Sequence, residues 1–139
     1  MKPAFLSLNE TTYGQHQHWM QAALQLAQTA GDAGEVPVGV VVVDGEGNCL
    51  ARAYNGKERS HNPTAHAEML AIAQATKLRQ DWRLSDCTLY VTLEPCPMCA
   101  GAILHARIGL LVYGANDPKT GAIRTVLNLP DSPASNHRL

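Results

Sequence analysis

The chain has 139 residues, of which 45% are hydrophobic and 17% charged, and its formal net charge is −1. These values are typical of one compact folded domain. They exclude a disordered chain, which would have fewer apolar residues and a larger net charge. This net charge neither requires nor excludes nucleic acid, because contacts to phosphates would depend on a local basic patch.

The sequence also bears on membranes and secretion. The longest apolar run, residues 38–43, is far shorter than the about 20 residues that span a bilayer. The first ten residues contain one basic residue and an apolar stretch too short for a secretory signal. We therefore expect a cytoplasmic protein without a membrane segment.

The first expected element is a helix over residues 12–30. Asn9, Thr11 and Thr12 are candidate N-caps, and Gly31 and Gly34 follow the last apolar position. The apolar residues recur at helical spacing: Trp19, Met20, Ala23, Leu24, Ala27 and Ala30.

A β-hairpin is expected next. The run 38–44 is rich in β-branched residues, the segment 44–48 has the composition of a turn, and residues 49–55 return as a second strand. A polar loop over residues 56–63 follows.

The remaining chain alternates between helices and strands. A helix is expected from Thr64, as its cap, to about Leu78. Its apolar face would consist of Met69, Leu70, Ile72 and Ala73. A strand at 87–93, a helix at 96–106, a strand at 108–113 and a loop after Gly114 complete the pattern. This order predicts an α/β fold, a three-layer α/β/α sandwich around one mixed sheet with right-handed crossovers.

The cysteines divide into two kinds. Cys49 and Cys87 stand alone inside expected strands and are interpreted as small buried apolar residues. Cys96 and Cys99 are three residues apart in a Pro-Cys-Pro-Met-Cys segment that opens a helix. At this spacing both sulfurs can face one ion, and a helix N-terminus stabilises the thiolate form that binds metal.

A third ligand is available at the start of the preceding helix. His66, together with Cys96 and Cys99, would leave one tetrahedral position open, which is typical of a catalytic rather than a structural zinc site. Glu68 lies two residues after His66, so it does not share its helix face and is poorly placed to bind the same ion. It can instead take a proton from a zinc-bound water, whose pKa is lowered to roughly 7.

Each segment alone has an ordinary interpretation. The cysteine pair could be a redox dithiol, and a histidine or glutamate at a helix start could be a surface residue or a dipole partner. The site could also be a structural zinc module without catalysis, although such a site needs no carboxylate beside an open position. The His-Ala-Glu and Pro-Cys-x-x-Cys segments together favour catalysis.

These two segments match the known signature of the zinc nucleobase deaminases, so the chain resembles the cytidine deaminase-like superfamily. It is most similar to the bacterial tRNA adenosine deaminase family, from about Trp19 to Leu139. Further matching segments are 35–39, 62–68, 89–94, 107–109, 117–122 and 136–138. The last two go beyond what deamination needs and favour the tRNA branch.

The resemblance implies hydrolytic conversion of adenosine to inosine at the wobble position of a tRNA anticodon. It implies one Zn²⁺ per subunit, a Glu68 that moves a proton from water to the ring nitrogen, and a homodimer that binds a tRNA anticodon stem-loop. It also implies substrate contacts from six residues: Asn55, Val36, the backbone of Ala67, Asp117, Lys119 and Thr120.

Alternatives to these assignments remain open. The same zinc site would serve deamination of free guanine, cytosine or cytidine, and only the pocket and RNA contacts distinguish the substrates. Asn55 and Asp117 could simply make turns, and Lys119 could be a solvated surface residue. Four basic residues after position 105 favour RNA modestly: Arg107, Lys119, Arg124 and Arg138.

The C-terminal part differs from the family pattern. Family members continue past the Asn-His-Arg stretch into a C-terminal helix, which this chain does not contain. We therefore expect residues 1–139 to form a single deaminase domain in which residues 131–139 are an unanchored tail.

Overall fold

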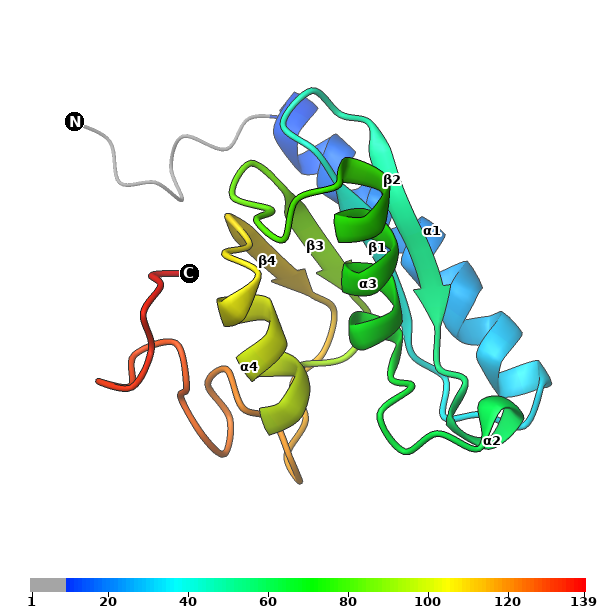
Figure 1. The fold of residues 1–139 in the computed structure, drawn as a ribbon. Helices are drawn as coiled ribbons and strands as arrows, with labels where there is room; N and C mark the ends of the chain where they lie inside the picture. The colour runs from blue at the N-terminus through cyan, green and yellow to red at the C-terminus, as the bar shows by residue number, and fades with distance from the viewer. Residues whose placement is uncertain (1–9) are drawn as a thin grey trace.

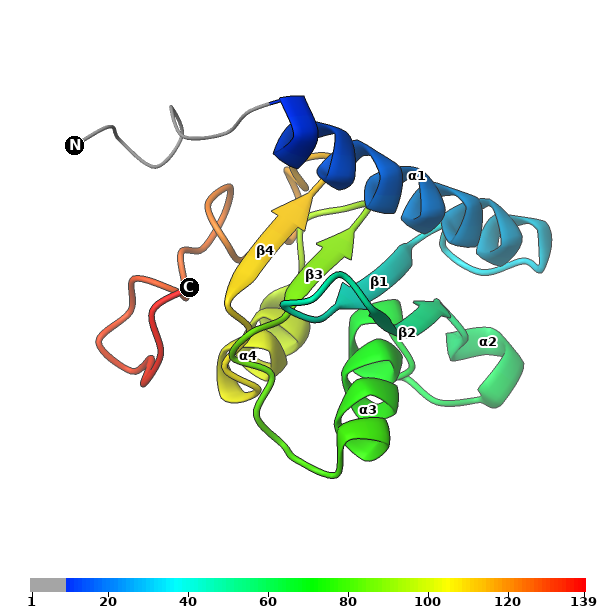
Figure 2. The same ribbon diagram turned by 90° about the horizontal axis from the view of Figure 1, so that it is seen from above.

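The computed structural model describes residues 10–139 and contains one four-stranded sheet with helices on both faces (Figures 1 and 2). The helices are α1 (Glu10–Asp32), α2 (Lys57–Ser60), α3 (Ala67–Arg79) and α4 (Pro97–His105). The strands are β1 (Gly39–Val43), β2 (Cys49–Tyr54), β3 (Thr88–Val91) and β4 (Leu110–Tyr113).

The sheet is mixed, with the strand order β2-β1-β3-β4. Strand β1 pairs antiparallel with both β2 and β3, whereas β3 and β4 are parallel. The carboxyl ends of β2, β3 and β4 therefore meet at the same edge of the sheet. Helices α3 and α4 follow β2 and β3 in the chain, so their N-termini start near that edge. The predicted hairpin and mixed sheet are confirmed.

Helix α1 covers one face of the sheet, and α3 and α4 cover the other (Figure 2). Strand β1 is buried along its whole length. Val40 and Val42 pack in the core cluster that contains the buried alanines of α3 and Ile103 of α4, whereas Val41 and Val43 pack with Ala23 of α1. Burial on both faces is typical of a central strand between two helical layers. The predicted three-layer sandwich is confirmed.

Helix α3 packs through alanines. Ala67, Ala71 and Ala75 are four residues apart and 0% exposed, so they form one stripe along the helix. The apolar face predicted from the sequence is only partly correct: Leu70 and Ile72 are partly buried and pack against the core, whereas Ala73 is exposed. Met69, the fourth predicted residue, is partly buried. The small alanine side chains allow the helix backbone to lie close to the sheet and to α4.

Helix α3 begins at Ala67 rather than at Thr64. The Thr64 hydroxyl and amide donate to Asn62 Oδ1 at 2.8 and 2.9 Å, so the predicted cap instead belongs to a local turn. The residue at the N-cap position is His66, and its side chain makes no capping hydrogen bond.

Two further elements differ from the predictions. The expected loop 56–63 contains the short helix α2, and α1 runs from Glu10 to Asp32, which places Thr11 and Thr12 inside the helix. Asn9 lies outside the described residues. Leu24, predicted on the buried face of α1, has an exposed fraction of 53%. Of the two isolated cysteines, which were both predicted to be buried, Cys87 is buried and Cys49 is half-buried.

The segment 131–139 is anchored, which corrects the expectation of a free tail. His137 Nε2 lies 2.7 Å from the carbonyl oxygen of Ile108, and the partly buried Leu139 packs against the main hydrophobic core cluster. A polar contact to a backbone carbonyl and an apolar contact at the last residue hold this segment to the domain.

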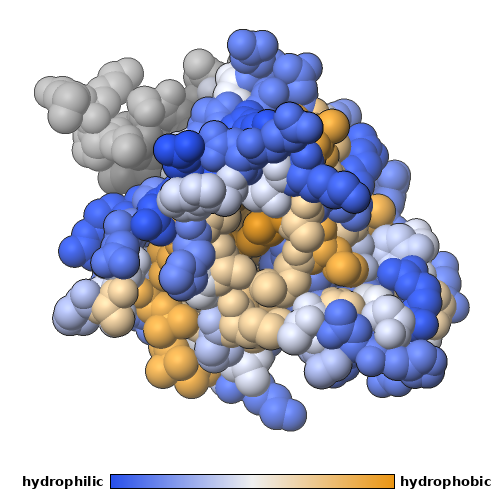
Figure 3. Space-filling view, in the orientation of Figure 1, coloured by the Kyte–Doolittle hydropathy of each residue, from blue (hydrophilic) through white to orange (hydrophobic). Residues whose placement is uncertain are grey.

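The surface is mixed in character. On the face that α3 and α4 cover, apolar residues lie toward the centre and one side and are bordered by hydrophilic residues (Figure 3). Within residues 10–139, no helix has the length and apolarity needed to cross a membrane.

Gly39 provides a test of how closely α1 packs on the sheet. A Cβ at this position would lie 2.0 Å from the carbonyl oxygen of Ala23 and 2.7 Å from the amide of Ala27, both backbone atoms of α1. We expect Gly39→Ala to lower the free energy of unfolding by about 1–3 kcal/mol or more. Urea denaturation of the zinc-loaded wild-type and variant proteins would measure this difference in the free energy of unfolding.

The matched control is Gly14→Ala in α1, where a Cβ has no neighbour within 4 Å. The better helix propensity of alanine should raise stability there by up to about 1 kcal/mol. Equal effects of the two substitutions would contradict the close packing inferred at Gly39.

Candidate metal centre and active site

Three potential metal ligands come together at the sheet edge where α3 and α4 begin. His66 Nδ1 lies 3.7 Å from Cys96 Sγ and 3.5 Å from Cys99 Sγ. The ligand atoms of all three residues lie within 4.8 Å of one another. The sequence therefore correctly predicted that these three residues would converge.

The spacing of the cluster suits zinc. Bonds of about 2.3 Å to sulfur and 2.0–2.1 Å to nitrogen at tetrahedral angles would place those donors about 3.6 Å apart. The distances from His66 Nδ1 to the two sulfurs bracket this value. Two thiolates and one imidazole are also a donor set that zinc prefers. The residues fit a zinc ion with one further coordination position open.

The first residues of α3 and α4 position the metal ligands and favour ionisation of one of them. His66 and Cys96 are the N-cap residues of α3 and α4, and neither side chain caps its own helix, so both can face the metal position. A hydrogen bond from the Cys99 thiol, together with the backbone amides of Cys99 and Met98, lowers the pKa of Cys96 to about 5. The amides at the N-terminus of α4 thus favour the thiolate form at Cys96.

Glu68 lies in the first turn of α3 and is 4% exposed. Burial, and to a smaller extent the proximity of Cys96, raise its pKa from 4.5 to about 7. A carboxyl group with a pKa near neutrality can both accept and donate a proton at physiological pH. Glu68 also lines the pocket beside the ligand cluster, so it is placed for acid–base chemistry there.

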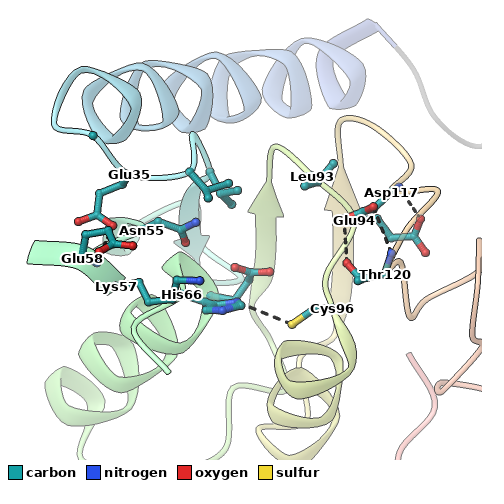
Figure 4. A pocket seen from close by; sticks show the side chains of 14 residues that line it. Glu35, Asn55, Lys57, Glu58, His66, Leu93, Glu94, Cys96, Asp117 and Thr120 are labelled. Atoms are coloured by element: carbon teal, nitrogen blue, oxygen red, sulfur yellow. Dashed lines mark hydrogen bonds between the residues drawn. The ribbon is translucent and has the colours of Figure 1, made fainter. Parts of the chain in front are cut away.

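The cluster opens into a pocket of about 240 Å³ at the carboxyl edge of the sheet. This volume is below the about 300–1,000 Å³ of pockets that hold drug-sized ligands, so the pocket suits something as small as one base. One wall carries Glu35, Asn55 and His66, and the facing wall carries Glu94 and Asp117 (Figure 4).

Four of the six predicted substrate residues line this pocket: Val36, Asn55, Asp117 and Thr120. Val36 is 56% exposed, whereas Asn55 is buried. Lys119 is exposed and is not among the lining residues. The amide of Ala67 donates to Asn55 Oδ1 at 2.7 Å, so it lies behind Asn55 rather than free in the pocket.

Asp117 forms a local turn. Its Oδ1 accepts hydrogen bonds from the amides of Lys119 and Thr120 at 2.9 and 3.2 Å, and its Oδ2 accepts from the Thr120 hydroxyl at 3.0 Å. The structural interpretation of Asp117 as a turn residue is therefore correct, and the same residue borders the pocket. The turn fixes Thr120 beside it.

Two buried glutamates in the pocket wall had no role assigned from the sequence. Glu94 is 2% exposed and accepts hydrogen bonds from four backbone amides and one hydroxyl of the loop after β4. Its donors are the amides of Asp117, Ile123, Arg124 and Thr125, at 2.9–3.1 Å, and the Thr125 hydroxyl. Burial opposes ionisation of Glu94, but these donors outweigh it and lower its pKa to about 2.

Glu35 likewise accepts hydrogen bonds from backbone amides, on the opposite wall of the pocket. Its carboxylate accepts hydrogen bonds from the amides of Glu58 and Arg59 at 2.9 and 2.8 Å, which fixes the start of α2. The bond from the Glu58 amide is the largest cause that lowers the pKa of Glu35. The sequence signal for Glu94 was a glutamate directly after an expected apolar strand, and Glu35 lies in one of the segments that match the family, but neither signal identifies the donors.

The comparisons with known proteins agree with this geometry. The family model of MafB19-like deaminases matches residues 14–139. The tRNA-specific adenosine deaminase of Haemophilus influenzae is 50% identical over 120 residues, which span 86% of this chain and 69% of that protein. Its Bacillus subtilis counterpart is 47% identical over 124 residues, which span 89% and 76%.

Solved structures show the same fold. One, from studies of A-to-I editing by tRNA:A34 deaminases at the wobble position, is 43% identical with a TM-score of 0.85 and covers 88% of this chain and 94% of that one. Guanine deaminase from Bacillus subtilis is 35% identical with a TM-score of 0.72 and covers 89% and 82%. This chain belongs to the tRNA-specific adenosine deaminase family.

Proposed function

We propose that the protein converts adenosine to inosine at the wobble position of a tRNA anticodon, by hydrolysis that releases ammonia. The observation that carries this proposal is a zinc-type donor cluster with a buried glutamate at the bottom of a pocket sized for one base. Relatives that are up to 50% identical are named tRNA-specific adenosine deaminases, which supports adenosine in RNA as the substrate.

His66, Cys96 and Cys99 would hold the metal. When bound, Zn²⁺ supplies Lewis acidity, which makes a water molecule acidic enough to react near neutral pH. Glu68 would take a proton from the water that attacks C6 of adenine and deliver it to the ring nitrogen N1. A second proton transfer through Glu68 would let the amino group leave as ammonia. The pKa of Glu68, about 7, allows the carboxyl group both to accept and to donate a proton near neutral pH.

The pocket residues would hold the base. The Nδ2 group of Asn55 has no hydrogen-bond partner among the described residues, and Asn55 lines the pocket, so it would donate to an acceptor on the base. Val36 would form an apolar wall. The amide of Ala67 would be a shared donor, bifurcated between Asn55 Oδ1 and the base.

Asp117, Lys119 and Thr120 would lie along the RNA next to the target nucleotide. The ligand cluster lies inside a small pocket, so the adenosine would turn out of the anticodon loop to reach it. Lys119 is exposed at the loop surface, where an ammonium group can contact a phosphate.

A second candidate is deamination of a free base. The likeness to guanine deaminase from Bacillus subtilis favours it specifically. An assay of the zinc-loaded protein on an arginine tRNA anticodon stem-loop with adenosine at the wobble position, in parallel with free guanine, adenine, cytosine and cytidine, distinguishes the two. We expect inosine in the RNA, read by mass, and rates that fall as salt is raised. Turnover of guanine without RNA editing would favour the second candidate.

Glu68→Gln tests the proton transfer. The amide keeps the size of the side chain and removes its acid–base function, so kcat should fall by about 10²–10⁴. Zinc content by mass spectrometry should stay at one ion per chain. Glu46→Gln makes the same change on the exposed turn of the hairpin and should leave kcat unchanged. Wild-type kcat in Glu68→Gln would overturn its assignment.

Removal of a ligand tests the metal centre. We expect Cys96→Ser to lower zinc affinity at least about tenfold and to abolish activity. Cys49→Ser changes a half-buried thiol outside the cluster and should keep both zinc and activity. A chelator should inactivate the wild-type protein, and added Zn²⁺ should restore it. Full activity of zinc-free protein would contradict the proposed mechanism.

We also propose a cytoplasmic homodimer. The cytoplasmic location rests on the tRNA substrate. The dimer is supported by exposed apolar side chains, among them Val126 and Leu127 at 52% and 47%, just after the loop that Glu94 binds. Figure 3 shows other apolar residues reaching the surface of the face that α3 and α4 cover. Light scattering should give twice the chain mass of 15.0 kDa, and a 15.0 kDa particle would refute the dimer.

A further inference from the structure

We propose that Glu94 is a positioning residue, which holds the loop 115–125 in place so that Asp117 and Thr120 stand opposite Asn55 across the pocket. The effect of Glu94 on RNA rests on the proposed function, whereas its hold on the loop does not. Nothing in the acid–base chemistry requires this glutamate, so its burial in the pocket wall needs a separate explanation.

The hydrogen bonds of Glu94 exclude a catalytic role of its own. A carboxylate offers about four lone-pair sites, and five donors from the loop already face its two oxygens. Oε1 accepts from the Asp117 amide and the Thr125 hydroxyl, whereas Oε2 accepts from three consecutive amides. No lone pair remains for a substrate proton, so the carboxylate serves the loop.

Backbone contacts join the same two segments. The amide of Glu94 donates to the carbonyl oxygen of Ala115, and the amide of Ala122 donates to that of Pro95, both at 2.9 Å. Cys96, a proposed zinc ligand, is the next residue after Pro95. The loop is therefore fastened directly to the turn that presents the metal ligand, and its position is set relative to the metal centre.

Gly121 shows how tightly the loop surrounds the carboxylate. A Cβ at this position would lie 2.5 Å from both Cδ and Oε1 of Glu94 and 2.6 Å from the carbonyl oxygen of Asp117. The backbone thus lies in direct contact with the carboxylate, and only glycine fits there. This observation is independent of the hydrogen bonds and leads to the same conclusion.

Asp117 connects Glu94 to the pocket. Its amide is bound by Glu94 Oε1, and its carboxylate in turn binds the amide and hydroxyl of Thr120. Figure 4 shows Glu94, Asp117 and Thr120 together on the wall that faces Asn55. Loss of the Glu94 carboxylate would leave this wall free to move while the zinc ligands stay in place.

Glu94→Gln makes a graded test possible. A glutamine has one acceptor oxygen and one amide group that donates. If the oxygen stays with the three consecutive amides, the amide group faces the Asp117 amide, and the Thr125 hydroxyl can turn to accept from it. The substitution then deprives mainly Asp117 of its acceptor, whereas Glu94→Ala would also deprive Ile123, Arg124 and Thr125.

The experiment compares Glu94→Gln and Gly121→Ala with wild type and with Glu46→Gln, the same chemical change at an exposed site. Amide hydrogen exchange by mass spectrometry reports on peptides that span 113–127, zinc content reports on the metal centre, and kcat and KM are measured on the anticodon stem-loop. We expect exchange near Asp117 to become roughly ten- to a hundredfold faster in both variants. Zinc should remain at one ion per chain.

The kinetic expectation is a KM for the stem-loop at least about tenfold higher with kcat within about threefold of wild type, since the residue orients the RNA wall and not the reacting atoms. Unchanged exchange in Glu94→Gln and Gly121→Ala would overturn the inference. Faster exchange with unchanged KM would reduce Glu94 to a structural role, and a fall in kcat alone would make it catalytic. If the wild type makes no inosine, the proposed function fails, while the exchange data still decide whether Glu94 holds the loop.

Discussion

The close packing of α3 against the sheet and α4 determines where the chemistry of this protein takes place. The alanine stripe, with Ala67, Ala71 and Ala75 fully buried, brings the helix backbone close to its neighbours. The first turns of α3 and α4 consequently lie side by side at the carboxyl edge of the sheet, and His66 meets Cys96 there. Larger side chains in the stripe would separate the two helix starts and with them the metal ligands.

Two buried acidic residues line the pocket on opposite walls. The carboxylates of Glu35 and Glu94 both accept hydrogen bonds from backbone amides rather than from lysine or arginine side chains. Each amide would otherwise lie unpaired beside an apolar wall, which is costly. The two carboxylates therefore stabilise irregular backbone on either side of the pocket.

The sequence predicted most of the features that depend on residues close together in the chain. The hairpin, the alternation of strands and helices, and the Cys96–Cys99 pair follow from local spacing, and the fold class then brings His66 to them. It did not predict the buried face of α3, because alanine is compatible with either an exposed or a buried position. It also missed the partners of Glu94, which lie 23 to 31 residues away, since only the folded loop brings them together.

The hydrogen bond between Ala67 N and Asn55 Oδ1 has a consequence for molecular recognition. A carboxamide oxygen has two lone pairs, and the start of α3 occupies one of them and fixes the orientation of the carboxamide. The NH₂ group of Asn55 is therefore its freer side, so this wall favours ligand groups that accept hydrogen bonds. An aspartate here could keep the bond to α3 but would reverse that preference, so an otherwise conservative exchange would change which edge of a base the pocket accepts.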